Sequence, residues 1–265
     1  MPTPGKTGRL PARCPTELRD LSEYAELPTP PPAFNGYGLV REWPMYANDQ
    51  IGDCTLAAAA HLLESWNSDL PAEHKAAAVA PPSTDAVVRA YFRATGGQDS
   101  GLVEANVLRE WATSGLWGSR IGGYVPAQAQ NVEQLRRAMA AYGAVYLGVN
   151  LPEEAERQFE AGEPWTIDGK PTQPIGGHAV PAVGYDATGL YVVTWGRVQR
   201  ATWEWWLTYG EEAWVVLAPE FVNAKGGLEH LDIEALRADL AKIGVRTTPA
   251  ERRRGCAWWR RPSRS

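Results

Sequence analysis

The chain has 265 residues, of which 44% are hydrophobic and 22% are charged, and its formal net charge is −5. This length suits one large domain or two small ones, and the composition excludes a chain that is disordered throughout. No run approaches 18 apolar residues, so we expect no transmembrane segment, and the first 15 residues lack the apolar stretch of a secretory signal. Three cysteines make no disulfide framework, which favours a cytoplasmic protein or one carried in a virion.

The charge is unevenly distributed along the chain. Residues 246–265 contain seven arginines and one glutamate, about +6, so the remainder carries about −11. An acidic body argues against a dedicated nucleic-acid-binding domain. The basic tail, which also contains two tryptophans, is either a disordered solubilising segment or a contact for an anionic or protein partner.

The first segment, residues 1–34, contains eight prolines. Because proline fixes φ and lacks a backbone N–H, we expect an extended arm here. It is either a flexible leader or an arm that lies along this protein or a neighbour. A main domain is expected over residues 35–222, followed by a C-terminal helix and the basic tail over residues 223–265.

Six helices are predicted along the chain. The turn-rich residues before Asp53 lead into a run of alanines and leucines, and Asp53 is a natural N-cap, so a helix should begin at Cys54. Helical patterns that end at glycines or include amphipathic spacing follow. They cover residues 83–94, 103–114, 131–142, 152–160 and 231–243.

Strands are predicted in the second half. Residues 144–149 form an apolar run, and residues 178–185 and 190–195 make a hairpin around the turn 186–189. Pro181 implies an edge position or an irregularity in the first hairpin strand. A closing strand is expected over residues 213–218, whereas the aromatic residues 202–209 suit either a helix or a strand.

Cys54 is the first candidate for chemistry. A thiol in the first turn of a helix lies in the positive end of the backbone dipole, which favours the thiolate. The alternative is a small buried hydrophobic residue, which is the usual role of a lone cysteine.

A base for this thiol must come from the four histidines. His61 lies about 10 Å farther along the same helix and cannot reach the sulfur, while His74 and His230 suit the surface. His178 opens a strand directly after Gly176-Gly177, where glycines permit close approach of another segment. A histidine there can hydrogen-bond a thiol from a different element; the alternative is a polar strand start.

The run His178-Ala179-Val180-Pro181-Ala182-Val183-Gly184-Tyr185, followed by a hairpin and Trp195-Gly196, resembles the histidine strand of papain-like cysteine peptidases. The order of helix, strand, acidic segment and histidine strand is also similar. Gly52-Asp53-Cys54 before an alanine-rich helix resembles the nucleophile helix, especially that of bacteriocin-processing peptidases. The resemblance covers roughly residues 40–220.

This resemblance implies an α+β, two-lobed papain-like fold. A helical lobe, about residues 54–120, would pack on an antiparallel β lobe, about residues 131–220, with Cys54 and His178 facing each other across a cleft. It implies a cysteine peptidase or amidase that cleaves peptide or isopeptide bonds of a peptide or protein substrate. Cys54 would be the nucleophile and His178 the general base and acid. No cofactor is needed, and the isolated cysteines and scattered histidines predict no metal site.

Two positions depart from the family pattern. The oxyanion donor is usually a glutamine six residues before the cysteine; that position is Asn48, while Gln50 lies four before, and we favour Gln50 weakly. The third residue is usually Asn or Asp. Counting sixteen residues from His178 gives Thr194, and counting back from Trp195-Gly196 gives Val193. Valine cannot orient an imidazole, and threonine supports an imidazolium less than a carboxylate does.

These departures leave a second hypothesis. The chain would then be a catalytically weakened or inactive papain-like component of a larger assembly, such as a phage head or tail. The N-terminal arm and the basic tail would bind the assembly partners.

Overall fold

The computed structural model describes residues 5–11, 14–219 and 230–246, so the basic tail and Cys256 lie outside the described residues. Its α-helices are α1 (Cys54–Asp69), α2 (Thr84–Ala94), α3 (Glu104–Thr113), α4 (Val132–Tyr142), α5 (Glu153–Ala161), α6 (Trp203–Tyr209) and α8 (Ile233–Lys242). Its strands are β1 (Phe34–Asn35), β2 (Gly123–Ala127), β3 (Val145–Pro152), β4 (Pro174–Tyr185), β5 (Gly189–Thr194), β6 (Arg197–Thr202) and β7 (Gly210–Leu217).

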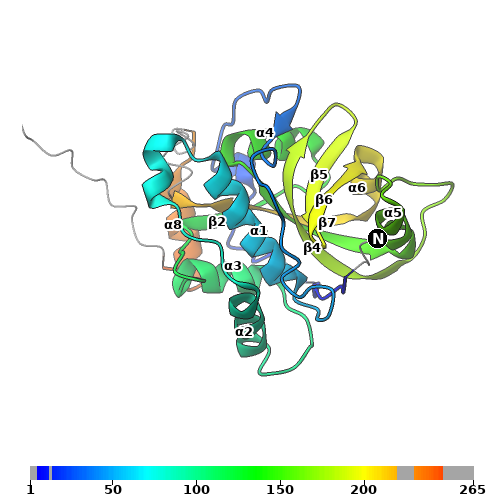
Figure 1. Cartoon of the computed structure of the whole chain (residues 1–265). Coiled ribbons are helices and arrows are strands. Elements are labelled where there is room, and N and C mark those ends of the chain that lie inside the picture. Colours follow the sequence, from blue (N-terminus) through cyan, green and yellow to red (C-terminus); the bar gives the residue numbers. More distant parts are fainter. Residues whose placement is uncertain (1–4, 12–13, 220–229, 247–265) are drawn as a thin grey trace, which may run out of the picture.

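The strands form one antiparallel sheet in the order β2-β7-β3-β4-β5-β6, and the short β1 pairs with β4 (Figure 1). The long strand β4 therefore lies inside the sheet, between β3 and β5. Pro181 is opposite Tyr146 of β3, and the pairing of β4 with β5 shifts register between Ala182 and Gly184. Proline is thus accommodated by an irregularity and not by an edge position.

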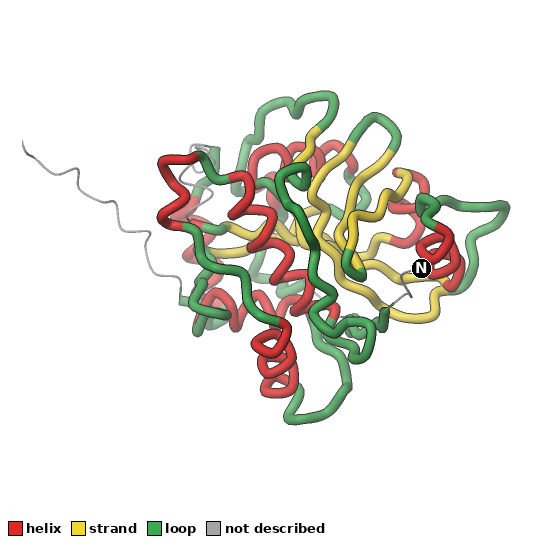
Figure 2. Tube along the Cα trace, viewed as in Figure 1, coloured by secondary structure: helices red, strands yellow, loops and turns green. Residues whose placement is uncertain are grey.

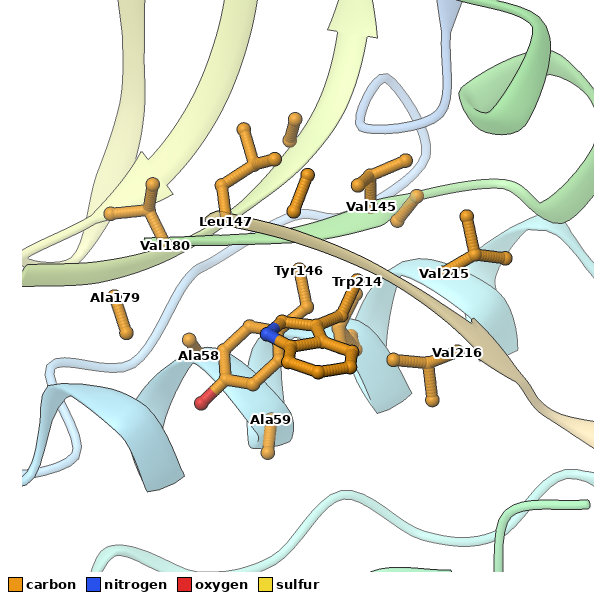
Figure 3. Packing of buried hydrophobic residues seen from close by; sticks show 14 of the residues in the cluster. Ala58, Ala59, Val145, Tyr146, Leu147, Ala179, Val180, Trp214, Val215 and Val216 are labelled. Carbon is orange, nitrogen blue, oxygen red and sulfur yellow. The ribbon is translucent and has the colours of Figure 1, made fainter. Parts of the chain in front are cut away.

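Helix α1 packs against one face of this sheet, as Figure 3 shows for Ala58 and Ala59 below the strands. Small side chains let the helix approach closely, and the rings of Tyr146 and Trp214 fill the space between the two layers. The Tyr146 hydroxyl donates to the Thr55 carbonyl, 2.8 Å away, in the first turn of α1. This bond ties the start of the helix to β3.

The helices predicted from the sequence are present, and capping residues mark several of their ends. The Ser83 and Asn131 side chains accept hydrogen bonds from the backbone at Ala86 and Gln134. Helix α4 ends at Gly143, whose φ of 81° suits glycine. The ambiguous aromatic segment is the helix α6, because the Thr202 side chain caps it.

Three strands were not predicted: the short β1, β2 and β6. β2 contains Gly123 and Pro126, which are typical of turns, yet it pairs with β7 throughout. β6 is rich in polar residues because only two of its six side chains are buried. β1 and β2 pair with strands far away in the sequence, β4 and β7, which local patterns do not reveal. β6 pairs with the neighbouring β5, and its polar composition concealed it.

Figure 2 shows α1, α2 and α3 on one side of the molecule and most strands on the other. Residues 14–34 lie along the protein itself. Leu18, Leu21 and Leu27 are buried, and the Tyr24 hydroxyl donates to the Asp239 carboxylate of α8 at 2.7 Å. Within the described residues, no helix is both long and apolar enough to cross a membrane.

Candidate active site

Cys54 is the first residue of α1, as predicted, and only 1% of it is exposed. Asp53 occupies the N-cap position, but its side chain makes no capping hydrogen bond. The N–H groups of Ala179 in β4 and of Gly8 lie at the sulfur, where each acts to lower the pKa of the thiol. The nucleophile candidate thus lies beside the residue that follows His178.

His178 lies in β4 opposite Val149 of β3 and is 1% exposed. Its Nε2 is 2.7 Å from the Thr194 hydroxyl at the end of β5, and Nδ1 has no hydrogen-bond partner among the described residues. Cys54 and His178 line one small cavity, of about 10 Å³, together with Asn48, Thr194 and Trp195. The structure therefore brings together the candidate nucleophile, the candidate base and a hydroxyl partner.

Burial makes both members of the pair neutral in this arrangement. It raises the pKa of Cys54 to about 12, more than the two nearby backbone N–H groups lower it. It also lowers the pKa of His178 to about 3, and the positive charge of Arg9 adds to that effect. A thiolate–imidazolium pair requires more water or fewer covering atoms than this state provides.

Trp195 packs beside the His178 ring. Its ring centroid is 4.9 Å from that of His178 and 4.8 Å from that of Phe159. Its φ of 45° is unusual for a side chain of this size and turns the chain tightly after Thr194. Val193 also lines the cavity, but the hydrogen bond to the imidazole comes from Thr194.

The two oxyanion candidates occupy different places. Asn48 is buried and lines the cavity, and its Nδ2 donates to the carbonyl oxygen of Lys6 at 3.0 Å and to that of Ile51 at 3.2 Å. Gln50 is exposed. Of the two candidates, only Asn48 lines the cavity, so its position suits an oxyanion donor better than that of Gln50.

His61, on α1 with Cys54, is a second buried histidine and lines the same cavity. It packs against the rings of Trp43 and Tyr46, and its Nε2 is 2.8 Å from the Pro44 carbonyl. Burial lowers its pKa to about 4. These contacts pack the His61 ring between α1 and the loop that precedes it.

The cleft is occupied by the chain's own N-terminal segment, by which we mean residues 5–11. The N–H groups of Gly8 and Arg9 donate to the Gly177 carbonyl at 3.1 and 3.0 Å, next to His178. On the opposite wall, Leu10 N–H donates to the Leu102 carbonyl and Leu102 N–H donates to the Gly8 carbonyl, both at 2.9 Å. The segment therefore bridges the two walls directly over Cys54.

Glycines make this approach possible, as the Gly176-Gly177 pair predicted. A Cβ at Gly177 would overlap the Arg9 backbone, and one at Gly176 would overlap the Thr7 side chain. A Cβ at Gly8 would overlap Gly52, just before α1. The segment that approaches was not predicted; the glycines at positions 5 and 8 of an otherwise proline-rich arm were its available signal.

Arg9 was also missed as a site residue. It is 3% exposed and pairs with the carboxylates of Glu104, Glu211 and Glu212. Among the described residues, no group of three or more His, Cys, Asp and Glu side chains is arranged to hold a metal ion.

No protein-family profile and no curated protein matches this sequence. Solved structures do match. Xylellain, a cysteine protease from Xylella fastidiosa, is 14% identical with a TM-score of 0.62, over 82% of this chain and 98% of that one. The cysteine protease and lectin-like domains of Cwp84, a surface layer associated protein of Clostridium difficile, are 16% identical with a TM-score of 0.50, over 74% of this chain and 54% of that one. At these identities the likeness shows the fold alone, and it confirms the predicted papain-like α+β fold.

Proposed function

On this papain-like fold, we propose that the chain is a cysteine peptidase or amidase that cleaves peptide or isopeptide bonds with Cys54 and His178. One observation carries the proposal. The sulfur at the start of α1 and the unpartnered Nδ1 of His178 share one cavity, while Nε2 of the same ring is held by Thr194. A nucleophile, a base and a third group that orients the base are what acyl transfer requires.

The proposed reaction has two halves. The Cys54 thiol gives its proton to His178, and the thiolate attacks the carbonyl carbon of the substrate. The tetrahedral intermediate collapses when the imidazolium of His178 protonates the leaving amine, which leaves a thioester on Cys54. His178 then takes a proton from water, the hydroxide attacks the thioester, and the carboxylic acid and the free thiol are released.

Asn48 suits the role of oxyanion donor. Its Nδ2–H group already donates to a peptide carbonyl in the cleft, that of Lys6. A donor held in this way and buried from water stabilises negative charge on a carbonyl oxygen. Thr194 would hold the His178 ring so that Nδ1 faces the sulfur.

The N-terminal segment must leave the cleft before a substrate can bind. The remaining cavity holds about one water molecule at most. Since the segment is held by backbone hydrogen bonds and by Arg9, loosening Arg9 should expose the pair.

The test is hydrolysis of a mixed peptide library by the full chain carrying Arg9→Ala, with cleavage read by mass spectrometry. We expect Cys54→Ala or His178→Ala in this background to lower the rate by about 10³-fold or more. Cys14→Ala is the matched control, because Cys14 is the other described cysteine and is exposed. Activity that survives Cys54→Ala would refute the proposal. A complete lack of hydrolysis in the parent would favour the inactive structural component instead.

A further inference from the structure

Three glutamates converge beside the catalytic pair and form what we call the acidic pocket: Glu104, Glu211 and Glu212. Glu104 opens α3 and is 0% exposed, and its carboxylate oxygens have no hydrogen-bond donor among the described residues. Glu211 and Glu212 lie in β7 and are 39% and 13% exposed at their side chains. The Trp214 indole N–H donates to Glu212 at 3.1 Å and fixes its carboxylate.

The Arg9 guanidinium fills this pocket. Its Nε lies 2.7 Å from Glu212 and 3.7 Å from Glu104, and its Nη2 lies 2.5 Å from Glu211. Burial alone would lower the pKa of Arg9, but Glu104 and Glu212 outweigh it and raise the pKa. Within the cleft, this pocket therefore binds a cation by direct charge pairing.

The walls of the pocket leave room for a long side chain. A Cβ at Gly148 of β3 would overlap the Arg9 guanidinium, and one at Gly177 would overlap the Arg9 backbone. The pocket is also close to the chemistry, because Arg9 follows Gly8, whose N–H group lies at the Cys54 sulfur. A chain that enters this cleft places one residue at Cys54 and a neighbouring side chain in the acidic pocket.

Without a cation, the acidic pocket is electrostatically unfavourable. Burial and Glu212 both hold the pKa of Glu104 well above its ordinary value, even with Arg9 present. Three clustered carboxylates repel one another and lose hydration, so they bind a positively charged group more tightly than a neutral one of the same shape.

We propose that the acidic pocket selects an arginine side chain of the peptide substrate, close to the bond that Cys54 attacks. This inference rests on the peptidase function proposed above and adds the substrate class. The N-terminal segment then holds, with Arg9, the place that the substrate's arginine takes. Arginine fits better than lysine because its Nε and Nη2 reach two different carboxylates, which a single ammonium group cannot match in this geometry.

The experiment measures binding apart from turnover. The full chain carrying Cys54→Ala and Arg9→Ala is titrated by calorimetry with acetyl-Ala-Ala-Arg-Ala-Ala-amide. The same peptide with citrulline, which has nearly the same shape but no charge, and with lysine are the comparison ligands. We expect the arginine peptide to bind about tenfold more tightly than the citrulline peptide, with the lysine peptide between them.

Variants of the pocket locate the effect. Glu212→Gln in the same background should bring the ratio of the two affinities close to one. Glu110→Gln is the matched control on the exposed face of α3 and should keep the ratio. Equal affinity for arginine and citrulline, no binding of either peptide, or a ratio that Glu212→Gln leaves unchanged would overturn the inference.

If the Arg9→Ala chain does not fold, a second variant replaces it. Arg9→Lys keeps a cation in the pocket but loses the two-carboxylate contact, and the same titration applies to it. Hydrolysis by the Arg9→Ala chain with Cys54 intact separates the two proposals. Cleavage without preference for arginine would refute the arginine specificity and support the peptidase. Arginine-selective binding without cleavage would support arginine binding by the acidic pocket and refute the peptidase.

Discussion

Two neighbouring residues of the N-terminal segment meet the cleft in opposite ways. Gly8 covers a pair that burial has left neutral, since the pKa of Cys54 is raised to about 12 and that of His178 is lowered to about 3. The buried guanidinium of Arg9 stays charged, because it pairs with Glu211 and Glu212 and faces Glu104, whose own pKa burial holds well above its ordinary value. Burial thus leaves Cys54 and His178 neutral, because neither faces an opposite charge, whereas the carboxyl groups around Arg9 preserve the charge of its guanidinium.

The two sites are also coupled. The positive charge of Arg9 is the second cause, after burial, that keeps the pKa of His178 low. Departure of the N-terminal segment, which the proposed function requires, would give the pair access to water and remove this charge at once. Both changes would favour the thiolate–imidazolium form, so in this proposal the segment would control the protonation of the pair as well as access to it.

The largest effect is expected at Asn48 on the neutral side of the cleft. In the Arg9→Ala chain, Asn48→Ala should lower kcat for peptide hydrolysis by about 10²-fold, because a buried oxyanion donor is lost. Gln50→Ala is the matched comparison and should change kcat little, since Gln50 is exposed. A larger loss for Gln50→Ala than for Asn48→Ala would reverse the assignment.

The next largest effect is expected at Arg9, in the acidic pocket. Arg9→Ala should raise the rate of Cys54 alkylation by iodoacetamide at pH 7 by about tenfold or more, because the covering segment loses its anchor. Peptide mass spectrometry reads the modified residue. Arg19→Ala is the control, because Arg19 lies in the same arm but pairs with Asp239 of α8 at 2.9 Å. An equal increase of the Cys54 alkylation rate in both variants would show that Arg9 does not specifically hold the N-terminal segment over Cys54.

A smaller effect belongs to Thr194. Removing its hydroxyl with Thr194→Val should lower kcat about tenfold in the Arg9→Ala chain and leave KM nearly unchanged, because one net hydrogen bond that orients His178 is lost. Thr194→Ser should restore most of the rate. Unchanged kcat in the valine variant would mean that Trp195 packing alone orients the ring.

The smallest effect is expected at His61. Burial lowers the pKa of this histidine with no contribution from Arg9. Its folded pKa of about 4 is below the ordinary 6.5, so its contribution to stability is lost as pH falls below about 6.5. Between pH 7.5 and 5.5, His61→Phe should therefore lose about 1 kcal/mol less unfolding free energy than the wild type. Urea unfolding at the two pH values measures this; an identical loss in both proteins would contradict the burial argument.

Local patterns predicted much of this site. The alanine-rich run after Asp53 fixed where α1 begins and so placed Cys54, and the hairpin spacing brought Thr194 to His178. The sequence did not separate Asn48 from Gln50, because the choice between two nearby amides depends on how the turn before α1 folds, which leaves Asn48 in the cavity lining and Gln50 exposed. The arm's extended backbone followed from its prolines. Its position did not, because Arg9 meets Glu211 from 202 residues away, and no local pattern encodes such a contact.

The most direct test of the account is the pH dependence of Cys54 alkylation in the Arg9→Ala chain, with and without His178→Ala. We predict a rate that stays high well below the ordinary thiol pKa of about 8.5 and falls when His178 is removed, which is the behaviour of a thiolate–imidazolium pair. A rate that rises only near pH 8.5 in both proteins would contradict the account, because an uncovered Cys54 would then be an ordinary thiol.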